Sequence, residues 1–169
     1  PITYQLQDHI LPVATISGEL IQHVDMDSAI FFDGSKSTGR SITYFWEFGD
    51  STFSTSPTPS QVYTIPGVYQ INLTVTDDYE NTSTASIVVN VKNVPPTAVA
   101  GADMYSPCED EPIMFDASGS WDTPSDSISF LWDFGDGSQS AEVSPIHAYH
   151  DQGEYDVRLT VMDLYGGES

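Results

Sequence analysis

The sequence is poor in cysteine and in positive charge. Its 169 residues include one cysteine, Cys108, so no disulfide can form within the chain and a stable fold must depend on packing. Four Lys and Arg residues face 25 Asp and Glu residues, which gives a formal net charge of −21. A surface of this sign repels nucleic acid and anionic membranes, and it attracts cations. We therefore expect no nucleic-acid partner, whereas cations remain candidate ligands.

Long apolar runs and helical periodicity are also missing. No run approaches the ~20 apolar residues of a membrane-spanning helix, so the sequence predicts no membrane insertion by this segment. It has no signal peptide and no initiator Met, and we interpret it as a processed product or an excerpt of a longer chain. High net charge can also indicate disorder, but the regular alternation of Val, Ile and aromatic residues argues against it.

One pattern occurs twice in the sequence. The segment Trp46–Asp50 recurs at Trp132–Asp136, 86 residues later, and the residues that follow recur at the same spacing. The repeated positions are Tyr63 and Tyr149, Gly67 and Gly153, Tyr69 and Tyr155, Leu73 and Leu159, Val75 and Val161, and Asp77 and Asp163. Upstream the spacing is slightly shorter, so the second copy has a short insertion. Such self-similarity predicts two domains, at residues 10–93 and 94–169, joined by a Pro-containing linker.

Apolar and polar residues alternate in several segments, which is typical of strands with one buried face. The expected inward rows of the first copy are Tyr44, Trp46 and Phe48, and Tyr69, Ile71, Leu73 and Val75. Those of the second copy are Phe130, Trp132 and Phe134, and Tyr155, Val157, Leu159 and Val161. Residues 29–32 and 84–91 predict further strands, with turn residues between the segments. Several short strands at this spacing predict an all-β fold of two tandem β-sandwiches.

These residues carry a resemblance to a known family. Trp-Asp/Glu-Phe-Gly-Asp, then Pro and Tyr, then Gly-X-Tyr, then Leu-Thr-Val-X-Asp occur in both copies, and this order resembles the polycystic kidney disease (PKD) domain family. The resemblance implies immunoglobulin-like sandwiches without the buried disulfide. It also implies an extracellular location, as in archaeal surface-layer proteins, secreted hydrolases and cell-surface receptors. The first copy departs from the pattern at Ser51, where the second has Gly137, and its loop after Ser37 is shorter.

The two copies differ at their ends. The first copy closes with a further strand, whereas the second stops at Ser169, where that strand would begin. Residues 1–9 have no place in the first copy, but Ile2, Tyr4 and Leu6 alternate as in a strand. We therefore expect residues 1–9 to form a strand that completes the second sandwich of another unit, through a covalent or a non-covalent head-to-tail connection. The predicted partners are copies of the chain or neighbouring repeats.

Oxygen-bearing side chains cluster in one loop of the second copy. Asp116, Asp122 and Asp126 lie there, together with Ser118 and Ser120. Ca²⁺ prefers about six to eight oxygen ligands, often from several acids of one loop. Some members of the PKD family bind Ca²⁺ through this region, so the resemblance implies a Ca²⁺ site at Asp116, Asp122 and Asp126. A solvated acidic loop is the alternative, and the shorter loop of the first copy predicts no such site.

Other residues have a structural interpretation or a weak motif. Asp50 and Asp136 follow Phe-Gly at strand ends, where aspartate typically accepts backbone hydrogen bonds in a turn, and we expect no catalytic residue. Asn72 and Asn81 each begin the Asn-X-Ser/Thr acceptor pattern for N-glycosylation. Trp121 lies in the inserted loop, where we expect it either to cap the sandwich or to contact a partner or a sugar.

The combination predicts a non-enzymatic, extracellular structural repeat unit of a cell-surface array or filament. No phosphate-binding loop, nucleophile elbow or Cys/His cluster occurs in the sequence. A first alternative is a spacer or accessory module of a secreted hydrolase, which a catalytic block in the full gene would favour. A second alternative is an adhesin module, which requires a defined ligand surface. A long run of near-identical units would favour the filament.

Overall fold

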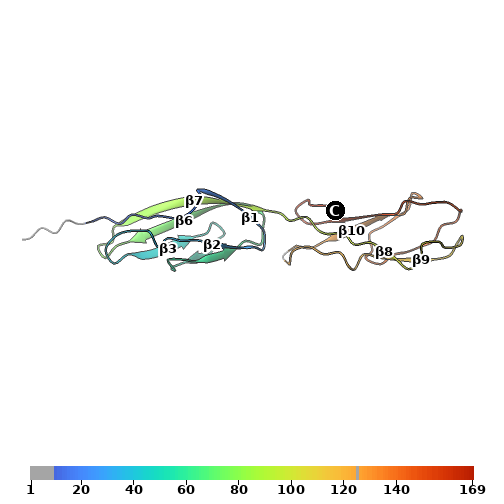
Figure 1. Cartoon of the computed structure of the whole chain (residues 1–169), viewed down its shortest axis with the longest axis horizontal. Coiled ribbons are helices and arrows are strands. Elements are labelled where there is room, and N and C mark those ends of the chain that lie inside the picture. The colour runs from blue at the N-terminus through green and yellow to red at the C-terminus, as the bar shows by residue number, and fades with distance from the viewer. Residues whose placement is uncertain (1–9, 125) are drawn as a thin grey trace, which may run out of the picture. The chain divides into compact units, whose positions relative to one another are not determined.

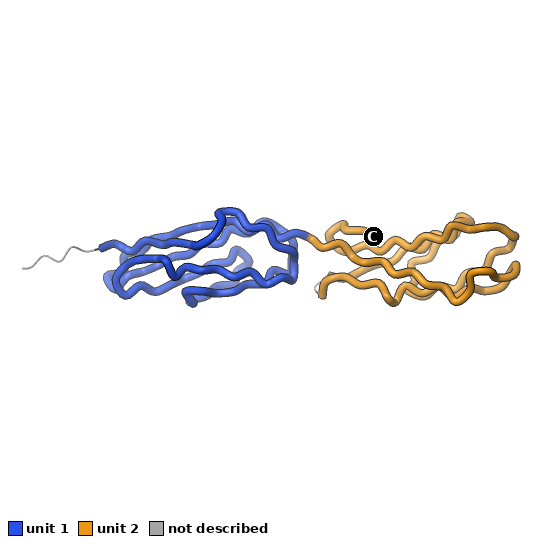
Figure 2. Tube along the Cα trace, in the orientation of Figure 1, with its two compact units in different colours: residues 1–92 blue, residues 93–169 orange. Residues whose placement is uncertain are grey.

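The computed structural model describes residues 10–124 and 126–169 (Figure 1). These residues form strands, turns and irregular segments, and no helix occurs among them. The chain divides into two units, Pro1–Lys92 and Asn93–Ser169, which Figure 2 colours separately. The predicted all-β fold of two tandem immunoglobulin-like sandwiches is confirmed, and the division falls one residue before the predicted boundary.

Unit 1 is a sandwich of a five-stranded and a two-stranded sheet. The larger sheet has the order β1-β7-β6-β3-β4, and the smaller sheet pairs β2 with β5. The strands are β1 (Ile21–Asp25), β2 (Ala29–Phe31), β3 (Thr43–Glu47), β4 (Phe53–Ser54), β5 (Ser60–Val62), β6 (Gly67–Thr76) and β7 (Thr82–Lys92). β7 lies between β1, to which it is parallel, and β6, to which it is antiparallel. It is therefore a central strand of its sheet.

The core of unit 1 is built on the predicted inward rows. Trp46 and Phe48 are at most 2% exposed, and the Phe32 ring packs against both of them. The polar atoms of the buried aromatic side chains are paired. Trp46 Nε1 donates to the Ser56 carbonyl over 2.9 Å, and the Tyr63 hydroxyl donates to the Phe48 carbonyl over 2.9 Å. Because a buried donor without an acceptor costs free energy, these two contacts fix the orientation of both rings.

Unit 2 repeats this architecture with shorter strands. Its two sheets have the orders β11-β10-β13 and β12-β9-β8. The strands are β8 (Gly101–Ala102), β9 (Ile113–Asp116), β10 (Ser129–Asp133), β11 (Gln139–Ser140), β12 (Ile146–His147) and β13 (Arg158–Met162). The core residues are Ile113, Phe115, Ala117, Trp132, Phe134 and Tyr149. The Tyr149 hydroxyl donates to the Phe134 carbonyl over 2.9 Å, as its counterpart does in unit 1.

The predicted strand at Tyr155–Val161 is shorter in the structure, because β13 begins only at Arg158. Its counterpart β6 is paired along its whole length by β7. In unit 2, Glu168 and Ser169 take the place of the first residues of β7, and the Ser169 N–H donates to the Val161 carbonyl over 3.0 Å. The described part of unit 2 therefore offers residues 153–157 no ladder partner, and a strand is defined by its ladder.

Residues 1–9 lie outside the described residues, so the structure leaves the expected strand of Ile2, Tyr4 and Leu6 as a prediction. Within the described residues, no helix is long and apolar enough to cross a membrane. The single cysteine, Cys108, is a free, exposed thiol. Both sandwiches are therefore held by packing and hydrogen bonds, as the cysteine count predicts.

Candidate metal centre

Three carboxylates of unit 2 converge. Asp122 and Asp126 come from the loop between β9 and β10, and Asp163 follows β13 directly. One carboxylate oxygen of each lies within 4.8 Å of the other two. The loop is the inserted segment of the second copy, whereas Asp163 belongs to the repeated Leu-Thr-Val-X-Asp motif. The structure thus brings two of the three predicted ligands together with an acid that is distant in sequence.

Asp116, the remaining predicted ligand, lies elsewhere. Its carboxylate accepts the Ser118 N–H over 2.9 Å and the Ser118 and Ser144 hydroxyls over 3.0 and 3.1 Å. The hydrogen bonds from Ser118 lower the pKa of Asp116. Asp33 of unit 1 accepts the Ser35 N–H over 2.8 Å in the same way. The structure therefore places Asp116 in a turn that both units share, and not among the converging acids.

In Asp122 and in Asp126, one carboxylate oxygen accepts a hydrogen bond and the other has no hydrogen-bond partner among the described residues. Oδ1 of Asp122 accepts the Thr123 N–H over 2.7 Å, and Oδ1 of Asp126 accepts the Ser127 N–H over 2.8 Å. Both Oδ2 atoms are buried and have no hydrogen-bond partner among the described residues, and the same holds for Asn93 Oδ1 and Thr123 Oγ1. Buried oxygens without a donor are costly, so this arrangement suits a positively charged ligand.

Asp163 is oriented by donors from two sides. Asn93 Nδ2 donates to Oδ2 over 2.6 Å, and the N–H groups of Tyr165 and Gly167 donate to Oδ1 over 2.8 and 2.7 Å. Burial raises the pKa of Asp163, but the hydrogen bonds from Asn93 and the backbone outweigh it and lower the pKa overall. A Cβ at Gly167 would clash with the Asp163 carboxylate and approach the Asn93 amide. The centre therefore needs an ionised Asp163 and no side chain at residue 167.

The donor set fits Ca²⁺ in number and chemistry. The three acids offer carboxylate oxygens, which are ligands that this hard cation prefers, and Asn93 and Thr123 carry further buried oxygens without a hydrogen-bond partner among the described residues. Water can complete a shell of about six to eight oxygens. No His or Cys belongs to the group, so a metal that prefers nitrogen or sulfur ligands, such as Zn²⁺, is disfavoured.

The corresponding region of unit 1 contains an arginine, Arg40, in place of the converging carboxylates. Asp77, the counterpart of Asp163, accepts the N–H groups of Tyr79 and Asn81, each over 2.9 Å, and the Asn81 side-chain amide. Arg40, from the shorter loop, forms an ion pair with Asp78 over 3.1 Å and stacks on the Tyr79 ring at 5.8 Å. Three carboxylates converge in unit 2, whereas the corresponding region of unit 1 contains the positive charge of Arg40. Unit 1 also has Asn81 where unit 2 has Gly167.

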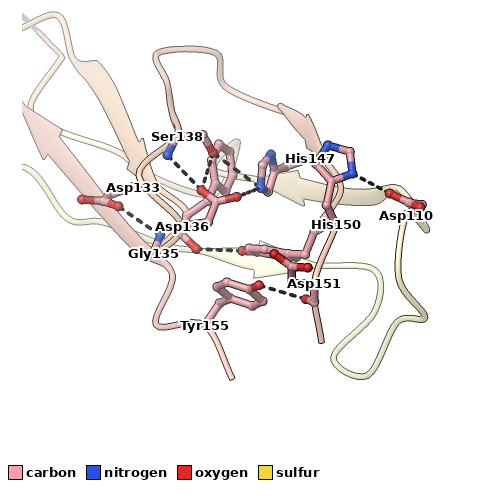
Figure 3. A network of polar contacts seen from close by, with 11 residues as sticks. Asp110, Asp133, Gly135, Asp136, Ser138, His147, His150, Asp151 and Tyr155 are labelled. Carbon is pink, nitrogen blue, oxygen red and sulfur yellow. Dashed lines mark hydrogen bonds and ion pairs between the residues drawn. The ribbon is translucent and has the colours of Figure 1, made fainter. Parts of the chain in front are cut away.

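The Phe-Gly-Asp turns form a second polar network, shown for unit 2 in Figure 3. Asp136 accepts the Ser138 N–H and hydroxyl over 2.9 and 2.6 Å, and His147 Nε2 lies 2.8 Å from its other oxygen. The Ser138 hydrogen bonds, followed by His147, lower the pKa of Asp136 to about 2. In unit 1, Gln61 Nε2 donates to Asp50 over 2.6 Å instead. Both acids hold a turn closed, as predicted.

The two glycosylation candidates differ in geometry. Asn72 lies on β6, and its Oδ1 accepts the Ser86 hydroxyl over 2.7 Å. Asn81 lies in the turn after β6, and its Nδ2, the atom to which an N-glycan attaches, donates to both carboxylate oxygens of Asp77 over 3.3 and 3.1 Å. A glycan on Asn81 would break these hydrogen bonds, so the structure favours Asn72 of the two.

Trp121 does not cap the sandwich. Its side chain is 59% exposed, while its backbone forms a bridge with Thr97 through two hydrogen bonds of 2.8 and 3.1 Å. This exposure argues against the expected cap, and contact with a partner or a sugar stays a prediction.

Comparison with known proteins places both units in one family. Residues 11–91 and 93–169 each match the family model described as PKD domain. Collagenase ColQ1 of Bacillus cereus (strain Q1) is 46% identical over 65 residues, which cover 38% of this chain and 7% of that protein. Pre-pro-metalloprotease PrtV of Vibrio cholerae is 30% identical over 141 residues, which cover 78% of this chain and 14% of that protein.

The dyslexia-associated protein KIAA0319 homolog of Mus musculus is 30% identical over 178 residues, which cover 94% of this chain and 16% of that protein. This chain therefore spans only a small part of the length of these relatives. Among solved structures, the PKD1 domain of Vibrio anguillarum Epp has a TM-score of 0.43 and 28% identity, with 52% of this chain and 100% of that chain covered. The PKD domain is a non-catalytic module, and it forms part of collagenases and a metalloprotease. With both of its units matched, the chain belongs to the PKD domain family.

Proposed function

We propose that this chain is an extracellular structural repeat unit of a cell-surface array or filament, with a Ca²⁺ ion in its second unit. The observation that supports the Ca²⁺ part of the proposal is the convergence of Asp122, Asp126 and Asp163, with buried, unpaired Oδ2 atoms on Asp122 and Asp126. Sites in extracellular modules typically bind Ca²⁺ with Kd of about 10⁻⁴–10⁻³ M, which suits a compartment rich in this ion. The net charge of −21 supports the same setting, because it keeps a polymer soluble in salt.

The bound ion has a structural role in this proposal. It would join the loop between β9 and β10 to the turn after β13, and it would neutralise carboxylates that otherwise repel one another. A ligand that binds only the folded state stabilises it, by about 2.7 kcal/mol at a hundredfold excess over Kd. Ca²⁺ therefore adds stability to unit 2.

Calorimetry of the full chain tests the Ca²⁺ site. We expect Ca²⁺ to raise the melting temperature relative to a chelator, and the Asp122→Asn variant to lose this rise. The matched control is Asp116→Asn, which removes the carboxylate at the end of β9, outside the converging group, and should keep the rise. A melting temperature that does not respond to Ca²⁺, or a response that Asp122→Asn leaves intact, contradicts the proposal.

Electron microscopy of the native material, together with the mass of the constituent polypeptide, tests the array. Regular assemblies built from units of this size support it. A single large polypeptide that carries a catalytic domain contradicts it and supports the second candidate, a spacer within a secreted hydrolase. That candidate is favoured by one observation, the match to collagenases and to a metalloprotease. In both cases the two PKD domains are structural and the Ca²⁺ test above is unchanged.

A further inference from the structure

Unit 2 contains a groove of about 690 Å³ that opens onto its hydrophobic core. One wall is formed by residues 153–157 and the other by residues 104–108. The floor consists of core side chains, Ile113, Phe115, Trp132 and Tyr149. A groove with an apolar floor and acidic residues in its lining, among them Glu109, Asp151 and Glu154, is a candidate docking surface.

The same positions are covered in unit 1. Ile71, on β6, is 0% exposed, whereas its counterpart Val157 is 37% exposed. The difference arises because β7 lies beside β6 in the same sheet, with Ile87 as the direct partner of Ile71 in the ladder. Among the described residues of unit 2, only Glu168 and Ser169 continue the chain into the position of β7. The groove is thus the place of a strand.

The missing position is that of a central strand, which has a neighbour on both sides. In unit 1 the second neighbour of β7 is β1, and residues 104–108 of unit 2 correspond to β1. The correspondence is marked by Asp27 and Asp110, which have φ of 59° and 57° and whose N–H groups donate to the Tyr63 and Tyr149 carbonyls. A strand in the groove would form an antiparallel ladder with residues 153–157 and a parallel ladder with residues 104–108.

We infer that this groove receives residues 2–6 of a second copy of this chain. Gapless continuation from Ser169 to residue 1 aligns Ile2, Tyr4 and Leu6 with Ala85, Ile87 and Val89 of β7. These are inward-facing positions, since Ile87 and Val89 are 4% and 0% exposed.

The register follows from the pairing of unit 1. Ile87 pairs with Ile71 and Val89 with Tyr69, so Tyr4 takes the place beside Val157 and Leu6 the place beside Tyr155. The polar residues Thr3 and Gln5 then take the positions of Ser86 and Val88, on the opposite face. A slip of one residue would turn Tyr4 and Leu6 away from the groove, so one register is preferred.

This inference rests on the proposed function, because it states how repeat units would connect. A groove on one copy and a strand on the next form a heterologous contact that does not close on itself, and such a contact produces a linear polymer. The polymer can be covalently continuous or assembled from separate subunits. An isolated chain of these 169 residues tests the contact itself. If one chain binds another through this groove, the strand in the groove comes from a separate molecule.

Disulfide trapping in the full chain tests the register. In a Cys108→Ser background, Tyr4→Cys combined with Val157→Cys should give a ladder of cross-linked oligomers under oxidation, because directly opposed residues of antiparallel strands have Cβ atoms about 4.5–5.5 Å apart. The matched control, Gln5→Cys with Val157→Cys, should give at least about tenfold less. An equal yield from both pairs, or a cross-linked monomer in place of a ladder, overturns the inference.

A second measurement keeps the test independent of the cysteines. Tyr4→Asp should weaken concentration-dependent assembly in sedimentation at least about tenfold, because it places a charge in the apolar groove, whereas Gln5→Asp should leave assembly unchanged. Equal assembly of the two variants overturns the inference. If cross-linking fails while the native material still forms arrays, the strand–groove contact is rejected and the proposed array is kept. If cross-linking succeeds while the native protein is a spacer in a hydrolase, the proposed array is rejected and the strand–groove contact is kept.

Discussion

Units 1 and 2 share a framework and differ in what surrounds it. Both bury a Trp and a Phe of the same motif and hold them with a Tyr that donates to the Phe carbonyl. Unit 1 covers this core with β7 and places Arg40 beside its last turn, whereas unit 2 has a groove and three converging acids at the corresponding positions. The repeated residues therefore determine the fold, and the two candidate binding features of unit 2 combine repeated residues, such as Asp163 and Tyr155, with residues that do not repeat, such as Asp122 and Asp126.

The largest expected effect concerns the two tryptophans. Trp46→Ala should destabilise unit 1 by about 3–5 kcal/mol, because it empties a closed core and leaves the Ser56 carbonyl without its donor. Trp132→Ala should cost less, because its ring borders the groove and its Nε1 has no hydrogen-bond partner among the described residues. Denaturant unfolding of both variants measures the difference. An equal or larger loss in Trp132→Ala would show that the groove does not weaken the core of unit 2.

The next effect concerns Gly167, which unit 1 replaces by Asn81. Gly167→Ala should abolish the stabilisation by Ca²⁺, about 2.7 kcal/mol at a hundredfold excess over Kd, because the new Cβ clashes with the Asp163 carboxylate. Gly101→Ala is the control, since a Cβ there meets only the Asp116 carbonyl at 3.6 Å. Melting with and without Ca²⁺ distinguishes them. A Ca²⁺ response that survives in Gly167→Ala would contradict the assignment of Asp163 to the centre.

A smaller effect concerns the tyrosine hydroxyls. Tyr63→Phe and Tyr149→Phe each remove a hydrogen bond to a buried carbonyl, which should cost about 1 kcal/mol or somewhat more. Tyr63 is 2% exposed and Tyr149 8%, so water replaces the lost donor less easily in unit 1 and Tyr63→Phe should cost more. Chemical unfolding of the two variants side by side is the measurement. A larger cost for Tyr149→Phe would reverse this order of burial.

The smallest effect is the pH dependence of the Phe-Gly-Asp turn in unit 2. The pKa of Asp136 is lowered from 3.8 to about 2, so its contribution to stability is complete above pH 4 or so and is lost as the pH falls towards 2. Asp136→Asn should remove this part of the acid sensitivity, and melting between pH 2 and 5 compares it with the parent chain. Because the carboxylate is partly exposed, solvent screening keeps the effect small. An unchanged acid profile in Asp136→Asn would show that other carboxylates govern it.

The repeated pattern was sufficient to predict the fold. The inward rows of Trp46 and Leu73 and their counterparts lie in the cores, because a period of two on a strand depends only on local geometry. The strand from Tyr155 was predicted too long for a physical reason. Alternation in sequence reports which face of a segment is buried, whereas the strand itself requires a neighbouring backbone.

The candidate metal centre is only partly predictable from the sequence. Asp122 and Asp126 were identified by their density of oxygens, but Asp163 and Asn93 are distant in sequence and join them only through the fold. Asp116 is close to both acids in sequence, but in the structure it is the last residue of β9. A sequence signal against it existed, since Asp-X-Ser occurs at the same place in the first copy, at Asp33, where the serine N–H caps the carboxylate.

The position of Asn93 has a consequence for how these domains can be exchanged between genes. It directly follows Lys92, the last residue of β7, yet its amide orients an acid seventy residues further along the chain. A recombination event that joins a foreign first domain to this second domain keeps the hydrogen bond from Asn93 to Asp163 when its breakpoint lies before residue 93. A breakpoint one residue later keeps every strand of the second sandwich and removes the group that holds Asp163 in place.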